Sequence, residues 1–129
     1  FPGETEADFK ELLAFVDQYE FDNLGVFEYF REKGTAAYNL SDQVPAELKK
    51  ERRLRLEEAQ SRVIDRINKR LLGTTLETIA DGETFGRTYK DAPDIDGQVT
   101  FTRPVRTGQI FRAKVVQAHG YQRTLEPLK

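Results

Sequence analysis

The sequence predicts an α+β fold in which two helices and one buried strand precede a small, closed, antiparallel β-barrel. Two apolar stripes with helical spacing lie before residue 72, and a short, nearly continuous apolar run lies between them. After Gly73, short runs rich in Thr, Val, Ile, Phe and Tyr alternate with Gly-containing turns. With 38% hydrophobic and 33% charged residues, the composition is that of a folded, soluble protein.

The first helix is predicted to begin after Thr5 and to end near Glu20. The Thr5 hydroxyl can cap the first amides, and an acid at Asp8 suits the positive end of a helix. Apolar side chains then recur at steps of three and four residues on one face: Phe9, Leu12, Leu13, Val16 and Tyr19. The apolar run Leu24–Phe30 follows and is predicted to be a strand covered on both faces, which favours α/β architecture.

The second helix is predicted over Pro45–Leu71, after a loop rich in Gly, Thr, Asn, Ser and Asp. Proline suits a first helical position, and no Gly or Pro interrupts the segment. At 1.5 Å per residue the helix would be roughly 40 Å long. Its apolar stripe is narrow, so we expect it to link two parts of the chain, with Gly73 placed to end it.

Five short strands are predicted after the second helix, enough for a small closed barrel. The domain boundary is therefore expected near Leu72, with residues 1–71 forming one part and residues 72–129 the other. The predicted strands are Thr75–Ala80, Thr84–Lys90, Gln98–Thr102, Gln109–Ala118 and Tyr121–Glu126.

Charge is distributed unevenly along the chain although the net charge is only −2. Residues 1–48 carry 3 basic and 11 acidic side chains, whereas residues 49–70 carry 9 basic and 4 acidic ones. The overall field is too weak to draw the chain to nucleic acid or to a membrane. The basic run from Lys49 to Arg55 fits either RNA contact or, as we expect, a solvated helix face paired with acids.

Cysteine is absent, which excludes disulfides, cysteine nucleophiles and clusters held by thiolates, and one histidine cannot build a zinc centre. We therefore expect no metal site. No apolar run approaches the roughly 20 residues of a membrane helix, so a cytoplasmic setting is expected. The absence of methionine leads us to expect a segment of a longer protein.

Several motifs resemble one enzyme family along the whole chain. Phe1–Phe9, Gly25–Tyr29, Arg31 and Gly34-Thr35 resemble late barrel segments of the radical S-adenosylmethionine methylthiotransferases. Asp42–Pro45, Gly86–Tyr89 and Asp91–Gly97 resemble that family's linker and its TRAM domain, an OB-like barrel. The Asp91–Gly97 motif is similar to the branch that methylthiolates an aspartate of small-subunit ribosomal protein twelve.

The resemblance implies a parent enzyme that uses S-adenosylmethionine and two 4Fe-4S clusters, held by cysteines outside this chain. The fragment alone is then expected to be inactive, and its first part would be the end of the radical SAM barrel. Gly3, Glu4 and Arg31 are the candidate cofactor-binding residues. Their structural alternatives are a plain turn at Gly3, a charge complementing the helix end at Glu4, and a surface ion pair of Arg31 with a nearby glutamate.

The candidate substrate-binding residues lie in the barrel and are Arg87, Tyr89, Asp91, Asp94 and Asp96. Residues 72–129 have a net charge of only +1, from 8 basic and 7 acidic side chains, which offers little phosphate affinity. The aspartates would complement a basic polypeptide, so ribosomal protein twelve is the expected partner, with RNA contact as an alternative. The structural alternative is a turn between strands.

The sequence also departs from the family pattern. The family usually has acids near His119 and Gln122 and a Leu-x-Gly where Arg123–Leu125 stands, and this exchange weakens the protein-docking argument. A transfer-RNA methylthiotransferase fragment and a non-enzymatic RNA- or protein-binding adaptor therefore remain alternatives. Because apolar side chains of residues 1–48 would lack the rest of their barrel, we expect self-association or rearranged packing there.

Overall fold

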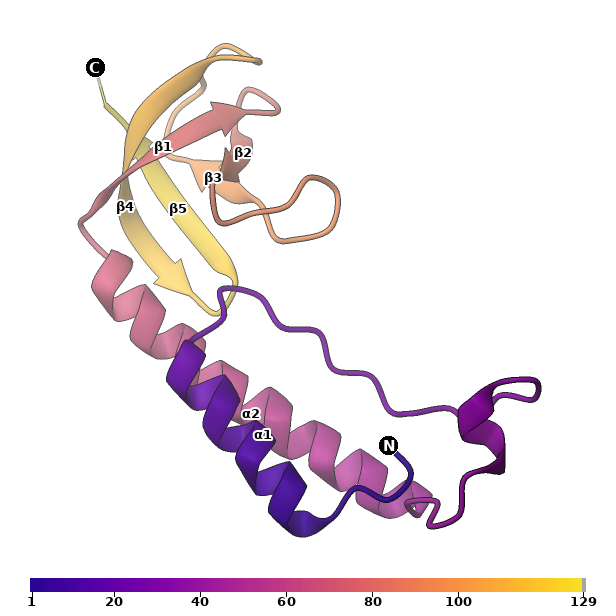
Figure 1. The fold of residues 1–129 in the computed structure, drawn as a ribbon. Coiled ribbons are helices and arrows are strands. Elements are labelled where there is room, and N and C mark those ends of the chain that lie inside the picture. The colour runs from indigo at the N-terminus through magenta and orange to yellow at the C-terminus, as the bar shows by residue number, and fades with distance from the viewer. Residues whose placement is uncertain (129) are drawn as a thin grey trace. The chain divides into compact units, whose positions relative to one another are not determined.

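The computed structural model describes residues 1–128, which fall into two compact units that meet at Val63 and Ile64. Two long helices, one 3-10 helix and five strands make up the described chain (Figure 1). Their order is α1 (Glu6–Tyr19), η1 (Ala36–Asn39), α2 (Ala46–Leu71), β1 (Thr75–Ala80), β2 (Phe85–Thr88), β3 (Val99–Phe101), β4 (Ile110–His119) and β5 (Gln122–Pro127).

Helix α1 begins with the capping box that the sequence predicts. The Asp8 amide donates to the Thr5 hydroxyl at 3.2 Å, and the Thr5 amide donates to the Asp8 carboxylate at 2.8 Å. Two backbone donors that the helix itself cannot satisfy are thereby paired. The helix ends at Glu20, whose φ of 48° is left-handed.

The capping box makes the stability of α1 depend on pH. Hydrogen bonds from the Thr5 hydroxyl, and then from its backbone amide, hold the pKa of Asp8 below the ordinary value of 3.8. A carboxyl group whose pKa is lowered by folding stabilises the folded state at pH values above its unfolded-state pKa. This stabilisation is lost as the pH falls through its folded-state pKa. We expect amide exchange in the first turn of α1 to speed up at such acidic pH. In Thr5→Ala the exchange rate should change less with pH, because Asp8 has lost the hydrogen bond from the Thr5 hydroxyl. Equal changes in the variant and in the wild type would contradict this role of the capping box.

Helices α1 and α2 pack side by side and run in the same direction. The Glu6 carboxylate contacts Arg55 near the start of α1, and the Gln60 amide donates to the Phe21 carbonyl at 2.7 Å just beyond its end. Between these contacts, Phe9, Val16 and Leu56 form a buried apolar cluster. The first unit is therefore held by a helix pair, with Leu13, Leu24 and Val26 packed against the same cluster.

The predicted strand at Leu24–Phe30 is not formed, and this part of the prediction was wrong. The segment is extended but has no strand partner among the described residues. Alternate side chains such as Val26 turn towards the helix pair, whereas Phe27 and Phe30 are 93% and 80% exposed. A strand covered on both faces needs neighbours for its backbone amides and carbonyls. All five strands of the described chain pair with one another in the barrel instead.

The barrel confirms the predicted five strands and closes in the order β1-β2-β3-β5-β4. One pair departs from the antiparallel prediction, because β3 runs parallel to β5, with Val99 opposite Arg123 and Phe101 opposite Leu125. The chain leaves β3, enters β4 and returns through a hairpin, so β5 reaches β3 in the same direction. The inward side chains form one core: Leu76, Ala80, Val99, Phe101, Ala113, Val115 and Leu125.

The last turns of α2 are fastened to the barrel within the second unit. Gly73 has a φ of +81°, which ends the helix as predicted, and its amide donates to the Val115 carbonyl at 2.8 Å. The buried Asn68 amide donates to the Gly120 carbonyl in the β4–β5 turn at 2.8 Å. Leu71 packs against the barrel core. These contacts fix the β4–β5 hairpin, which also supports the candidate site.

Candidate functional site

All five candidate substrate-binding residues lie in the β2–β3 connection or on β2 beside it, and three of them, Arg87, Asp94 and Asp96, line one hollow of the barrel. We call residues 89–98 the acidic loop. The loop and strand β2 enclose a hollow of about 580 Å³. Its lining residues are Asp81, Phe85, Arg87, Ala92, Pro93, Asp94, Asp96, Gly97 and Gln98.

Arg87 forms a two-pronged ion pair with Asp81 at the wall of the hollow. Its Nε lies 2.7 Å from Asp81 Oδ2 and its Nη2 lies 2.9 Å from Asp81 Oδ1. The hydrogen bonds hold the pKa of Asp81 below its ordinary value and raise the pKa of Arg87. Because these two charges compensate each other, Asp94 and Asp96 give the hollow a net negative charge.

Asp94 and Asp96 are displayed by a tightly turned loop. The Asp96 carboxylate accepts a hydrogen bond from the Ala92 amide at 2.7 Å, and the Asp96 amide donates to the Ala92 carbonyl at 3.2 Å. Asp94 adopts a left-handed φ of 60°, which aspartate tolerates better than most residues. Near the aspartates, the side chains of Tyr89 and Ile95 are 76% and 83% exposed.

Asp91 is placed differently from the other two aspartates, because its side chain is buried. One carboxylate oxygen accepts from the Thr88 amide at 2.9 Å and from the Thr88 hydroxyl at 2.7 Å. The other lies 3.3 Å from Nη1 of Arg123, and the two side chains of this pair are only 4% and 2% exposed. The Asp91 side chain therefore anchors the start of the loop to Thr88 and Arg123 and does not face the solvent.

Arg123 is the residue of this region that sequence reasoning missed. It lies on β5, 32 positions after Asp91, so no local spacing connects the two. The sequence signal that could have identified it is the alternation of inward and outward side chains along β5, which places both Arg123 and Leu125 at inward positions. A charged residue at an inward strand position requires a buried partner.

The candidate cofactor residues do not come together around one hollow. Glu4 lines a hollow of about 310 Å³ in the first unit, whereas Gly3 and Arg31 are not among its lining residues. The Glu4 carboxylate lies 2.7 Å from Nη1 of Arg52. Gly3 has a φ of +81°, and the Arg31 guanidinium donates to the Tyr38 carbonyl at 2.8 Å. The Gly3 amide donates to the Asp42 carbonyl at 2.9 Å, so each of the three residues has a structural contact within the first unit.

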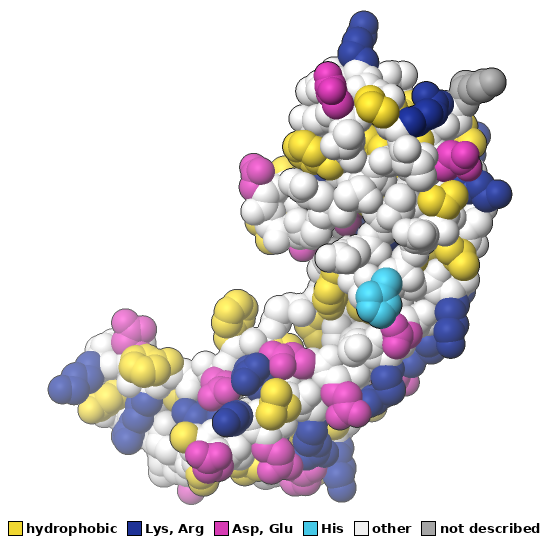
Figure 2. Space-filling view, turned by 180° about the vertical axis from the view of Figure 1, so that it is seen from behind, with side chains coloured by type: hydrophobic (Ala, Val, Ile, Leu, Met, Phe, Trp, Pro, Cys, Tyr) yellow, Lys and Arg dark blue, Asp and Glu magenta, His cyan; other side chains and the backbone are white. Residues whose placement is uncertain are grey.

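The basic run at the start of α2 is paired with acids, many of them from the acidic first part of the chain. Arg52 contacts Glu4 and Glu6, and Arg53 lies 2.9 Å from Glu28 and 2.6 Å from Glu57. Acids of residues 1–48 and the arginines at positions 52, 53 and 55 therefore meet inside the first unit. Figure 2 shows Lys or Arg and Asp or Glu side chains intermixed over the helical part on the face it displays.

The chain itself does not fit an iron–sulfur cluster, because such clusters need thiolate ligands and the sequence contains no cysteine. Within residues 1–128, no group of three His, Cys, Asp or Glu side chains is placed to hold a metal ion. The same residues contain no helix with the length and apolarity needed to cross a membrane.

The barrel defines the class of the second unit. A family model described as the TRAM domain matches residues 72–123, which include all of β1 to β4 and the acidic loop. The chain thus contains a TRAM domain, as the resemblance of the Gly86–Tyr89 and Asp91–Gly97 motifs led us to expect.

Curated relatives extend this similarity to the whole chain. The chain is 43% identical to the ribosomal protein uS12 methylthiotransferase RimO of Elusimicrobium minutum over 96% of its own length. Identity is 46% with the RimO of Thermus thermophilus and 45% with that of Geobacter sulfurreducens, over 95% and 94% of the chain. The chain spans only 29% to 31% of these three relatives. The similarity to methylthiotransferases that the motifs led us to expect is therefore confirmed over nearly the whole chain.

Proposed function

We propose that this chain is the C-terminal, substrate-recognising part of a methylthiotransferase that modifies an aspartate of ribosomal protein uS12. The names of the curated relatives support the enzyme and its substrate. In this proposal residues 72–129 are the TRAM domain. Residues 1–71 are the end of the radical SAM barrel with its linking helix.

The observation that carries the proposal is the net negative hollow beside the acidic loop. Asp94 and Asp96 add two negative charges next to a compensated Arg87–Asp81 pair. A basic polypeptide would be attracted to this surface, since complementary charge steers association and fixes orientation. Tyr89 and Ile95 supply exposed apolar area of the kind that anchors a protein partner.

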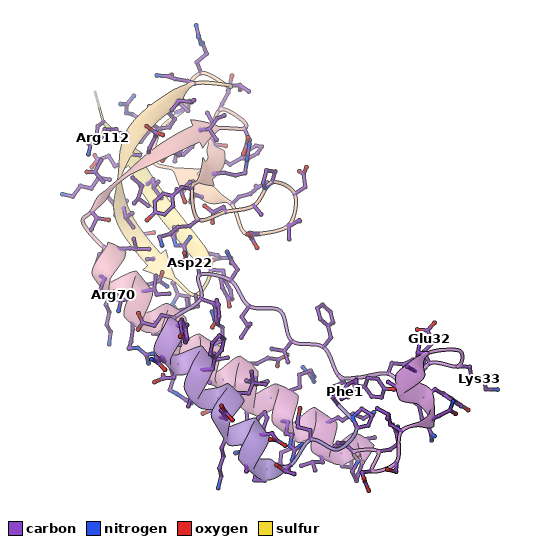
Figure 3. The ribbon with its side chains drawn as sticks, viewed as in Figure 1. Phe1, Asp22, Glu32, Lys33, Arg70 and Arg112 are labelled. Atoms are coloured by element: carbon purple, nitrogen blue, oxygen red, sulfur yellow. The ribbon has the colours of Figure 1, made fainter. Side chains whose placement is uncertain are left out.

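Protein docking fits the barrel better than RNA docking. A surface for single-stranded RNA needs a basic groove with aromatic platforms. Lys90 lies 5.0 Å from the ring centre of Tyr89, but the aspartates of the same loop oppose phosphate binding. Arg112 points outward from β4, on the side of the barrel away from the acidic loop (Figure 3). Arg112 therefore adds no positive charge to the surface of the loop.

The parent enzyme, in this proposal, uses S-adenosylmethionine and two 4Fe-4S clusters whose ligands lie outside this chain. The separate chain is then inactive, because it has no cysteine to hold a cluster. Glu4 lines the hollow of the first unit, and its carboxylate is already paired with Arg52. In the separate chain, the exposed rings of Phe27 and Phe30 favour self-association.

Neutralising the acidic loop should weaken binding of uS12. We expect the double variant Asp94→Asn/Asp96→Asn to lower the affinity of the chain for purified uS12 about tenfold at low salt, mostly through slower association. An asparagine at position 96 can still accept the hydrogen bond from Ala92, so the loop should keep its conformation. Titration calorimetry and stopped-flow association measure the two quantities.

The matched control removes the same charge elsewhere on the barrel. Glu77 and Glu126 are exposed on β1 and β5, and Glu77→Gln/Glu126→Gln changes the net charge by the same amount. This control should bind uS12 with nearly wild-type affinity. If the two double variants weaken binding equally, the effect is one of net charge and the acidic loop is not the docking site.

A further inference from the structure

The acidic loop is held at both of its ends by the β4–β5 hairpin. At its beginning, Asp91 meets Nη1 of Arg123 on β5 at 3.3 Å. At its end, Gly97 lies so close to the β4–β5 turn that an added Cβ would come within 3.0 Å of the Tyr121 carbonyl oxygen. The middle of the loop, with Asp94 and Ile95, remains exposed between these two supports.

The contact between Asp91 and Arg123 is poorly suited to stabilising the fold. Both side chains are almost fully buried, so each charge has lost most of its hydration. A single contact joins them, and Nε and Nη2 of Arg123 are buried without a hydrogen-bond partner. A buried ion pair repays its desolvation only when its geometry is excellent and its remaining donors are satisfied. The pair therefore requires an explanation other than stability.

Its geometry does fix the conformation of the loop. The two hydrogen bonds from Thr88 orient the Asp91 carboxylate, and Arg123 then joins the start of the loop to strand β5 of the barrel. A loop that is ordered before binding loses less conformational entropy when a partner docks. Arg123 thus acts on binding through the loop, without facing the partner itself.

We propose that Arg123 is a positioning residue for substrate recognition. By holding Asp91, it presets the acidic loop so that Asp94, Ile95 and Tyr89 are presented together to a basic polypeptide. This inference rests on the proposed function, since it assigns a recognition role to a residue that supports the same surface. It adds a specificity-determining residue on β5, outside the loop.

The test compares variants of the full 129-residue chain by two measurements. Titration against purified uS12 gives the affinity, and amide hydrogen exchange of Ile95 and Asp96, which both donate to the Ala92 carbonyl, reports the order of the loop. Arg123→Met should weaken uS12 binding about tenfold and speed exchange at these two amides. Arg123→Lys retains the charge and should restore most of the affinity.

A core variant separates loop positioning from general stability. Leu76→Ala lowers the stability of the barrel at a site in its core, so it should leave uS12 affinity and the exchange of Ile95 and Asp96 close to wild type under folding conditions. If Arg123→Met does not fold, Asp91→Asn tests the same contact and should give the same weaker binding and faster exchange. Asparagine can still accept the hydrogen bond from Thr88, but it carries no charge to pair with Arg123.

The outcomes distinguish this inference from the function on which it rests. Weaker binding by Arg123→Met with faster loop exchange, and neither effect in Leu76→Ala, supports the positioning role. Wild-type binding by Arg123→Met overturns the positioning role and leaves the proposed function standing. Absence of uS12 binding by the wild-type chain itself overturns the proposed function and the positioning role with it.

Discussion

Gly86→Ala is expected to prevent the barrel from closing. Gly86 is buried on β2, opposite Ala80 of β1 and Val99 of β3. An added Cβ would lie 2.0 Å from the Ile79 carbonyl oxygen and 2.8 Å from the Phe101 ring. Backbone cannot turn away as a side chain can, so β1 and β2 would have to separate. We expect a loss of about 3 kcal/mol or more in the free energy of unfolding, measured by urea denaturation.

Gly82→Ala is the matched control for this substitution. The three atoms nearest to its added Cβ all belong to the ring of Phe85, which is 36% exposed and can rotate away. A cost below about 1 kcal/mol is expected. Similar stabilities of the two variants would show that β1 and β2 do not approach as closely at Gly86 as the structure indicates.

Phe9→Ala is expected to detach α1 from α2. Phe9 is 1% exposed, packs with Val16 and Leu56, and has the Arg55 guanidinium 4.7 Å from its ring centre. Removal of a buried phenylalanine side chain costs about 3–5 kcal/mol. Because the barrel has its own core, amide exchange should accelerate through α1, whereas the Val115 amide should keep its protection.

Phe15→Ala tests whether burial causes this effect. Phe15 lies on the same helix and is 45% exposed, with its ring 4.4 Å from that of Tyr19. We expect a cost of about 1 kcal/mol. Equal loss of protection in the barrel and in α1 after Phe9→Ala would contradict the division of the chain into two compact units.

Elements with strong local signals were predicted well from the sequence. The Thr5 and Asp8 capping pair and the glycine at position 73 set helix ends, and each works through backbone groups only a few residues away. The first barrel strand, Thr75–Ala80, was predicted with the bounds that the structure shows. Alternating apolar residues between turn signals define such strands without knowledge of their partners.

Features that depend on distant partners could not be predicted. The extended segment Leu24–Phe30 has the apolar sequence of a buried strand, but a strand forms only where another strand satisfies its backbone. The parallel pairing of β3 with β5 follows from barrel closure and has no signature in either strand. In the candidate site, the spacing of Asp91, Asp94 and Asp96 did not reveal that Asp91 turns inward to Arg123.

The most direct test of the proposed function is titration of the chain, at two salt concentrations, against purified uS12 and against an unmodified transfer-RNA anticodon stem. The acidic loop predicts saturable binding of uS12 alone, with affinity that falls as salt screens its aspartates. Salt-dependent binding of the transfer-RNA stem without binding of uS12 would contradict the proposal, and would assign the chain to an RNA-directed methylthiotransferase or to an adaptor.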